Sequence, residues 1–372
     1  MTHNDLNYLN PEHQIRYQLS SKPLVTALIC NYNYGRFLAQ AIDSALAQTW
    51  QPIEVLVVDD GSTDESRSVL EKYKGRIRVI LKENGGQASA INAGISEARG
   101  EIISFLDSDD FWYPEKVKRT VEKYKLAPWG LVCHYLQNVD EASKHIINKT
   151  YSEFNKTSLE SGDLLDFIIK QGYSWVFSPT SGMSLPKQIT QKIFPLPENE
   201  WRICADNPLA YAAICHAPVG VINEPLGAYR LHSINRHAGL RHDRIAARLY
   251  HFTSRIERYF FLKDYLARLN RPVLNKELKH TYFFYRLYCL IVKERPWFYL
   301  FRLWRYNICY HLELSQNNNQ LWFNSARYLF LDTLLSILFF MHLPNPYNVL
   351  RKHFMQELPH LNPRIKDYIE SD

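Results

Sequence analysis

Four short apolar runs alternate with helical patterns over the first 126 residues, and this alternation constrains the fold more than any other feature of the 372-residue chain. The runs cover residues 24–30, 53–58, 77–81 and 101–106, and the helical patterns cover about 36–48, 63–73, 88–98 and 114–125. Short continuous apolar runs are typical of buried strands. Strands that alternate with helices predict a parallel sheet with helices packed around it.

Polar residues follow each of these predicted strands. The four clusters are Asn31–Asn33, Asp59–Ser62, Asn84–Gln87 and Asp107–Asp110. Ligands of such sheets bind beyond the carboxyl ends of the strands. We therefore expect all four clusters to meet at one edge of the sheet and to form a ligand site there.

The cluster after the fourth strand, Asp107-Ser108-Asp109-Asp110, holds three carboxylates in four residues. Close like charges repel, so such a cluster suits a site where a cation or hydrogen-bond donors offset the repulsion. Oxygen ligands favour Mg²⁺ or Mn²⁺, and Mg²⁺ commonly uses one or two carboxylates together with substrate phosphates. A solvated turn is the alternative, in which Asp110 caps the helix that begins near Pro114.

Two further carboxylates, Asp59 and Asp60, end the second predicted strand. One of them can accept a hydrogen bond from a nucleobase or a ribose hydroxyl while the other has a structural role. Ser62 and Glu65 have the spacing of a capping box, and Asp64 favours the same helix start. We therefore expect neither Ser62 nor Asp64 to bind a ligand.

Four ordered stretches together resemble the family 2 glycosyltransferases: LICNYN with Gly35, VVDDGSTD (57–64), ENGGQASAINAGI (83–95) and EIISFLDSDDFW (101–112). The resemblance covers about residues 23–235. It implies a GT-A fold, which is a Rossmann-like, mostly parallel α/β sheet flanked by helices. It also implies an inverting, nucleotide-sugar-dependent activity, with UDP as the expected nucleotide.

The resemblance also assigns roles to single residues. Asp60 is expected to bind a uracil-type base, Asp107 to lie near the ribose, and Asp109 to hold Mn²⁺ or Mg²⁺ at the diphosphate. Tyr32 is a safer nucleotide contact than Asn31, because Cys30-Asn31 replaces the usual Pro-Thr. Ile91 stands where the family often has an arginine. The expected nucleotide-sugar-binding residues are Cys30, Tyr32, Asp60, Gln87, Asn92, Asp107, Ser108, Arg230 and His232.

An inverting transfer needs one carboxylate that takes the proton from the acceptor hydroxyl. The family carries this base about a hundred residues after the metal motif, and the matching residue is Asp206 in Cys204-Ala205-Asp206-Asn207. Asp206 also suits a helix cap, and that role is compatible with catalysis. Glu198 and Glu200 are the rival bases nearby.

The stretch Tyr229–His237 is rich in cationic and donor side chains, and the family often shows Tyr-Arg-x-His at this point. Arg230 and His232 are expected to fold over the diphosphate, with Arg236 and His237 as weaker candidates. A solvated basic loop is the alternative interpretation.

Charge and aromatic residues divide the chain into two regions. Residues 241–372 hold 20 Lys and Arg against 11 Asp and Glu, although the net charge of the whole chain is only +6. We expect a polar tail over 1–22, a catalytic domain over 23–238 with a nucleotide half that ends near 112, and a basic, aromatic, mainly helical region over 239–372. That last region either packs on the catalytic domain or contacts an anionic membrane surface. Its most apolar stretch, 328–343, is shorter than the roughly 20 residues of a bilayer crossing.

The six cysteines form no CxxC pair and no signal peptide precedes the domain, so a cytoplasmic protein is expected, with peripheral contact to the plasma membrane as a further option. The expected acceptor is a glycan or a lipid-linked saccharide in cell-envelope polysaccharide assembly. Two other functions stay open. A sugar-phosphate nucleotidyltransferase would need a Gly-rich, Arg-containing phosphate loop where Asn31–Tyr34 stands, and a non-catalytic nucleotide-sugar-binding protein would not retain all the carboxylates. Nucleic acid is not an expected partner, because the basic residues form no run.

Overall fold

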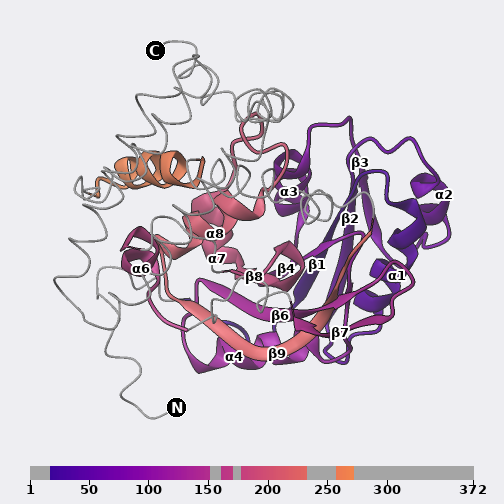
Figure 1. Ribbon diagram of the computed structural model, residues 1–372, viewed down its shortest axis with the longest axis horizontal. Helices are drawn as coiled ribbons and strands as arrows, with labels where there is room; N and C mark the ends of the chain where they lie inside the picture. The colour runs from indigo at the N-terminus through magenta and orange to yellow at the C-terminus, as the bar shows by residue number, and fades with distance from the viewer. Residues whose placement is uncertain (1–16, 151–160, 171–176, 233–256, 272–372) are drawn as a thin grey trace, which may run out of the picture. The chain divides into compact units, whose positions relative to one another are not determined.

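The computed structural model describes residues 17–150, 161–170, 177–232 and 257–271 of the chain. All of them belong to one compact unit, which comprises Met1–His242 and Glu257–Val273. In this part of the chain, nine strands form a single mixed sheet with helices on its faces (Figure 1). The strand order is β3-β2-β1-β4-β8-β6-β9-β5, and β7 pairs with β6.

The first half of the sheet is parallel, as the sequence predicts. Its strands are β1 (Val25–Asn31), β2 (Ile53–Asp59), β3 (Arg78–Leu81) and β4 (Ile102–Asp107). The pairs β1–β2, β1–β4 and β2–β3 are all parallel. The intervening helices are α1 (Gly35–Leu46), α2 (Ser66–Glu71) and α3 (Gln87–Glu97). The predicted fold class is therefore confirmed for this half.

Helices cover both faces of these strands. Leu38 and Ile42 of α1 pack with Val25 and Val57 in the main hydrophobic core. Helix α3 lies on the opposite face (Figure 1), and its Gly94 is so close to Leu28 that a Cβ there would collide with that side chain. This double cover explains why β1, β2 and β4 are buried almost throughout, whereas the edge strand β3 alternates in burial.

The second half of the sheet is mixed. Its strands are β5 (Phe111–Trp112), β6 (Leu131–Val139), β7 (His145–Thr150), β8 (Met183–Pro186) and β9 (Val219–Arg230). Strand β8 pairs antiparallel with both β4 and β6, whereas β6 and β9 are parallel. The helical segments are α4 (Lys116–Leu126), α6 (Leu165–Lys170), η3 (Thr180–Gly182), α7 (Lys187–Ile193) and α8 (Asp206–Ile214). Strand β9 pairs antiparallel with the short β5, which directly follows the Asp107–Asp110 cluster.

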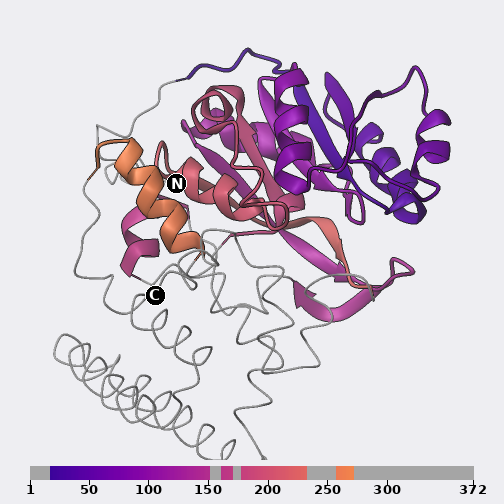
Figure 2. The ribbon, with the colours of Figure 1, turned by 90° about the horizontal axis from the view of Figure 1, so that it is seen from above.

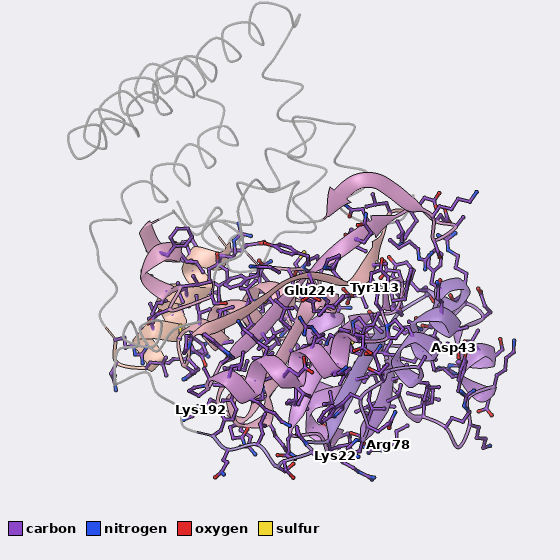
Figure 3. All side chains as sticks on the ribbon, turned by 90° about the horizontal axis from the view of Figure 1, so that it is seen from below. Lys22, Asp43, Arg78, Tyr113, Lys192 and Glu224 are labelled. Carbon is purple, nitrogen blue, oxygen red and sulfur yellow. The ribbon has the colours of Figure 1, made fainter. Side chains whose placement is uncertain are left out.

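Ion pairs join strands of the sheet to neighbouring elements, and Figure 3 labels one residue from each of two of them, Arg78 and Glu224. At the edge strand β3, Arg78 lies 2.6 Å from Glu54 of β2 and 2.9 Å from Glu97 of α3. In the second half, Arg119 of α4 pairs with Glu224 of β9. Charged side chains on an edge strand disfavour pairing with another chain, and Arg78 supplies one at β3.

A helix over residues 257–268 packs on the same unit (Figure 2, orange). Its Phe261 ring lies edge-on to Trp201 with 5.9 Å between the ring centroids, and the Tyr265 hydroxyl lies 2.7 Å from Nε2 of His216. None of the helices in the described ranges is long and apolar enough to cross a membrane. The predicted apolar stretch 328–343 and most of the predicted basic region lie outside the described residues.

Candidate active site

The carboxyl ends of β1, β2 and β4 lie side by side and bring three of the predicted polar clusters together. In the strand register, Asn31 is next to Asp59, and Cys30 lies between Val58 and Asp107. The remaining cluster, Asn84–Gln87 after β3, reaches the same edge through contacts with Asp60. The expected convergence of the strand ends is therefore found.

Asn31 and Tyr32 are neighbours in the chain but have opposite environments. Asn31 is buried, and its Nδ2 donates to Oδ1 of Asp59 at 2.8 Å and to Oγ of Ser66 at 2.9 Å. Tyr32 is 47% exposed. Asn31 thus ties β1 to β2 and α2, whereas the Tyr32 ring is accessible to a ligand. A nucleotide contact by Tyr32 stays a prediction.

Ser62 does not cap α2, contrary to the capping-box prediction. The helix begins at Ser66, and the Ser62 hydroxyl donates to Oδ1 of Asp59 at 2.5 Å and accepts the backbone N–H of Asn33 at 2.9 Å. Asp64 accepts the backbone N–H of Ser66 at 3.0 Å instead. The pattern was misleading because the buried Asp59 carboxylate competes for the same hydroxyl.

Asp60 is buried and holds the loop that follows β3. Its Oδ1 accepts Nζ of Lys82 at 2.7 Å and the backbone N–H of Gly85 at 3.0 Å, and its Oδ2 accepts the backbone N–H of Gly86 at 2.7 Å. Both carboxylate oxygens are therefore hydrogen-bonded within the chain. The predicted contact between Asp60 and a nucleobase would share these oxygens with the loop.

Gln87 contacts both the fourth-strand cluster and the segment that carries Asp206. Its Nε2 donates to Oδ1 of Asp107 at 3.4 Å, and its Oε1 accepts the backbone N–H of Ala205 at 2.9 Å. Its own backbone N–H donates to the carbonyl of Arg202 at 2.7 Å. One side chain therefore joins residues that are about a hundred positions apart in the sequence.

The first turn of α3 fixes the segment 201–205 against the sheet edge. The N–H groups at a helix start have no partner within the helix, and here Ala88 donates to the carbonyl of Trp201 at 3.2 Å. Gly86 has φ +90°, and a Cβ on it would lie 2.6 Å from Cα of Arg202. Only glycine adopts this backbone conformation readily at such a close approach.

Ser181 and Asp110 organise the turn after β4. The Ser181 hydroxyl accepts the backbone N–H of Asp107 at 3.1 Å. It donates in turn to Oδ2 of Asp110 at 2.6 Å. Oδ1 of Asp110 accepts the backbone N–H of Arg230 at 2.9 Å. Asp110 is thus a buried tether and not the cap of α4. Ser108 is also buried, and its hydroxyl has no hydrogen-bond partner among the described residues.

Arg230 and His232 both contact Asp109. Arg230 is 1% exposed; its Nε donates to the carbonyl of Asp109 at 2.7 Å and its Nη2 donates to Oε1 of Gln40 at 2.6 Å. Nε2 of His232 lies 3.0 Å from Oδ2 of Asp109. Both residues contact Asp109, and the Arg230 guanidinium donates to protein acceptors. The predicted contact of Arg230 and His232 with a diphosphate stays a prediction.

Three carboxyl groups at this edge have raised pKa values. Burial, with the charges of Asp109 and Asp206, raises the pKa of Asp107 to about 8. Burial also holds the pKa of Asp110 well above its ordinary value. For Asp206, burial raises the pKa to about 6, although the Asn207 backbone N–H and the Arg258 guanidinium act in the opposite direction. The charges of Asp109 and Asp206 act on Asp107, and the charges of Asp109 and Asp107 act on Asp110, because like charges disfavour a neighbour's ionisation.

Asn92 and Glu198 are hydrogen-bonded to each other. Asn92 exchanges hydrogen bonds with the backbone of Leu196, at 2.8 and 2.9 Å, and donates to Oε1 of Glu198 at 2.9 Å. The hydrogen bond from Asn92 lowers the pKa of Glu198. Asn92 therefore fixes the loop 196–198, and its predicted contact with the nucleotide sugar has no support in these contacts.

Cys30 completes the set of predicted binding residues. Burial, together with the carboxylates of Asp107 and Asp60, raises the pKa of its thiol well above the ordinary value, so the thiol stays protonated. Among the described residues, no group of three or more His, Cys, Asp or Glu side chains is arranged to hold a metal ion.

Residues 26–178 match the family model described as Glycosyl transferase family 2. The chain belongs to this family. This glycosyltransferase is 39% identical over 217 residues to an uncharacterized glycosyltransferase of Nostoc sp. (strain PCC 7120). The match covers 57% of this chain and 66% of that protein. It is 38% identical over 143 residues to the chondroitin synthase of Pasteurella multocida, over 37% of this chain and 15% of that protein.

Among solved structures, this glycosyltransferase is similar to S. aureus TarS 1–349 in complex with UDP-GlcNAc, with a TM-score of 0.47 and 19% identity over 65% of this chain and 71% of that one. The chain spans 66% of the length of the Nostoc protein and 33% or less of the length of seven other curated relatives, among them the Pasteurella chondroitin synthase.

Three site residues carry no signal that sequence reasoning used. Ser181 and Trp201 stand in irregular stretches, and their contacts come from segments far along the chain. Arg258 lies beyond the residues that carry the resemblance. An alternating or helical pattern cannot reveal such contacts, because each depends on the fold of both partners.

Proposed function

We propose that this glycosyltransferase moves a sugar from a nucleoside-diphosphate donor, with UDP as the nucleotide, to a hydroxyl group of a glycan or lipid-linked acceptor, with inversion at the anomeric carbon. The observation that carries the proposal is that Gln87 hydrogen-bonds both to Asp107 and to the backbone of Ala205, which precedes Asp206, at one end of the parallel strands, while the charges of Asp109 and Asp206 both act on Asp107. This is where ligands of such sheets bind. The family match supports the reaction class.

Asp206 is the general base in this proposal. A base works best when its pKa is close to the working pH, and the pKa of Asp206 is raised to about 6. The rival Glu198 has a lowered pKa and is hydrogen-bonded to Asn92. Asp206 takes the proton from the acceptor hydroxyl as that oxygen attacks the anomeric carbon. A single base on one face of the sugar suits an in-line displacement with inversion.

Asp109 is the residue that we propose to hold Mn²⁺ or Mg²⁺. The carboxylate oxygens of Asp109 suit a hard cation, and Nε2 of His232, 3.0 Å from Oδ2, orients this carboxylate. The raised pKa of Asp107 also fits, since a nearby cation relieves repulsion between carboxylates. The remaining ligands would come from the donor diphosphate and water. When bound, the ion would neutralise charge on the departing nucleoside diphosphate.

Arg230 and Asp110 position this motif. The guanidinium of Arg230 fixes the Asp109 carbonyl, and Asp110 fixes the backbone of Arg230 in return. We propose that the two hold Asp109 in one orientation and leave the nucleotide to Tyr32, Cys30, Asp60 and Asp107. We also propose that the catalytic domain begins near residue 22 and ends near residue 238. We further propose a cytoplasmic location with contact to a membrane surface.

The test is incubation of the full chain with a panel of UDP- and GDP-sugars and Mn²⁺, with aryl glycosides as acceptors. We expect release of a nucleoside diphosphate from one donor and a product of inverted anomeric configuration by NMR. Release of pyrophosphate would instead indicate a nucleotidyltransferase. No turnover with any donor would favour a non-catalytic binding protein.

Two variants separate the proposed roles. Asp109→Ala and Asp206→Ala should each abolish transfer, and only Asp109→Ala should weaken Mn²⁺-dependent UDP binding in calorimetry. Glu71→Ala, which removes an exposed carboxylate on α2, is the matched control. Transfer by Asp206→Ala at the wild-type rate would move the base to Glu198 or Glu200.

A further inference from the structure

The helix 257–268 lies outside residues 26–178, which match the family model, yet it contacts the segment that carries Asp206. Figures 1 and 2 both show this orange helix beside α8, which begins at Asp206. Its Phe261 ring packs on Trp201, whose carbonyl accepts the N–H of Ala88 in α3. The segment 201–207 is therefore held by α3 on one side and by this helix on the other.

Arg258 is the charged residue that the helix places next to α8. It is 5% exposed, and its Nη1 donates to Oδ1 of Asn207 at 3.3 Å. Asn207 follows Asp206 in the chain and donates through Nδ2 to the carbonyl of Cys204 at 3.3 Å. Cys204 has φ +59°, a conformation that few side chains adopt without support. Arg258 thus supports the turn on which Asp206 is mounted.

We propose that Arg258 is a positioning residue for Asp206, so that the helix 257–268 forms part of the catalytic unit. The proposal deepens the proposed function, because it rests on Asp206 as the base. Two charged groups are coupled electrostatically to Asp206 in the structure: Asp107 of β4 and Arg258. The charge of Asp206 raises the pKa of Asp107, and the Arg258 guanidinium acts to lower the pKa of Asp206.

The negative charge of Asp206 favours a buried arginine at position 258. A buried charge is costly unless an opposite charge or hydrogen-bond acceptors lie close to it. Arg258 has a hydrogen bond to Asn207 and lies near the negative charge of Asp206, and Asp206 gains a nearby positive charge that partly offsets the cost of its burial. A guanidinium is charged at every working pH, so this support does not depend on pH.

The experiment compares Arg258→Gln, Arg258→Lys and Arg268→Gln in the full chain. Arg268 is an exposed arginine of the same helix, so Arg268→Gln removes the same charge at a distance from the site. The titration of the Asp206 carboxyl is followed by ¹³C NMR, with its signal assigned by its loss in Asp206→Asn. We expect Arg258→Gln to raise the pKa of Asp206 by about one unit. Arg258→Lys and Arg268→Gln should leave it close to the wild-type value.

Kinetics give a second reading. Arg258→Gln should lower kcat for transfer by about tenfold or more with the donor KM unchanged, and the acid limb of kcat should move to higher pH. Arg258→Lys should restore the acid limb. Wild-type titration and wild-type kcat in Arg258→Gln would overturn the proposal. So would a loss of kcat without any change in the titration of Asp206, because a merely structural role predicts that.

Folding provides a reading that needs no turnover. If Arg258 compensates Asp206, Arg258→Gln should destabilise the chain less in an Asp206→Asn background than in the wild type, by urea unfolding at pH 8. Equal losses would contradict the coupling. If Arg258→Gln alone does not fold, a folded double variant supports the proposal and an unfolded one overturns it. An inactive wild-type chain would refute the proposed function while these titration and folding results still decide the role of Arg258.

Discussion

The two halves of the sheet place their functional residues by different physical means. In the parallel half, β1, β2 and β4 each end in a polar residue, and the register alone brings Asn31, Asp59 and Asp107 to one edge. In the mixed half, remote residues fix the segment that carries Asp206 and the backbone of Arg230: Gln87 accepts the N–H of Ala205, and Asp110 accepts the N–H of Arg230. The first arrangement follows from local sequence, whereas the second depends on the completed fold.

The largest expected effect comes from the mixed half. Asp206→Asn removes the base but keeps the shape of the side chain, so kcat for transfer should fall about 10²- to 10⁴-fold. UDP binding, which we assign to the parallel half, should change less than twofold in calorimetry. A matching loss of UDP affinity would show that the two halves are not separable in this way.

The contact between the halves is the next place to test. Gly86→Ala puts a Cβ 2.6 Å from Cα of Arg202 in a backbone conformation of φ +90°. We expect a loss of about 1–3 kcal/mol of unfolding free energy and a lower kcat, because the segment 201–205 must move. Urea unfolding and transfer assays measure both. Gly75→Ala is the matched control, since Gly75 also has positive φ but a Cβ on it would have no atom within 4 Å. Equal effects of the two changes would show that backbone strain alone, and not the contact with Arg202, is responsible.

Gln87 joins the halves through its side chain and should have a smaller effect. Gln87→Leu removes the hydrogen bonds to Asp107 and to the Ala205 N–H, which should lower kcat about tenfold with a small change in donor KM. Ser96→Ala, on the exposed side of the same helix, should behave as wild type. A raised donor KM with unchanged kcat would instead make Gln87 a direct ligand of the nucleotide sugar, as the sequence alone predicts.

The sequence predicts the parallel half of the sheet more fully than the mixed half. The runs 24–30, 53–58 and 101–106 predict β1, β2 and β4 to within about a residue at either end, because strands buried on both faces must be apolar throughout. The strand-end polar clusters and the position of Asp206 near them were also predictable. The burial of Arg230, the turn held by Ser181 and the helix over 257–268 were not. Each depends on a partner more than 50 residues away, and no periodicity records it.

The pH dependence of stability distinguishes Asp206 from an ordinary surface carboxylate. Its pKa in the folded chain is raised from 3.8 to about 6. A raised folded pKa means that protonated Asp206 stabilises the fold below pH 3.8, and that this stability is lost as the pH rises through about 6. In the metal-free chain, Asp206→Asn should therefore be more stable than the wild type at pH 8, by up to about 3 kcal/mol. The difference should vanish near pH 4, and a difference independent of pH would contradict the raised pKa.

Asn92 should have the smallest effect on catalysis, although it lies on α3 beside the site. Its side chain makes two hydrogen bonds with the backbone of Leu196 and one with Glu198, and none of these involves the strand-end carboxylates. Asn92→Ala should lower the free energy of unfolding by about 1–3 kcal/mol, because the Leu196 backbone loses its partners. Donor KM and kcat should stay within twofold of wild type. A donor KM raised tenfold would instead place Asn92 in the nucleotide-sugar site, as the sequence alone predicts.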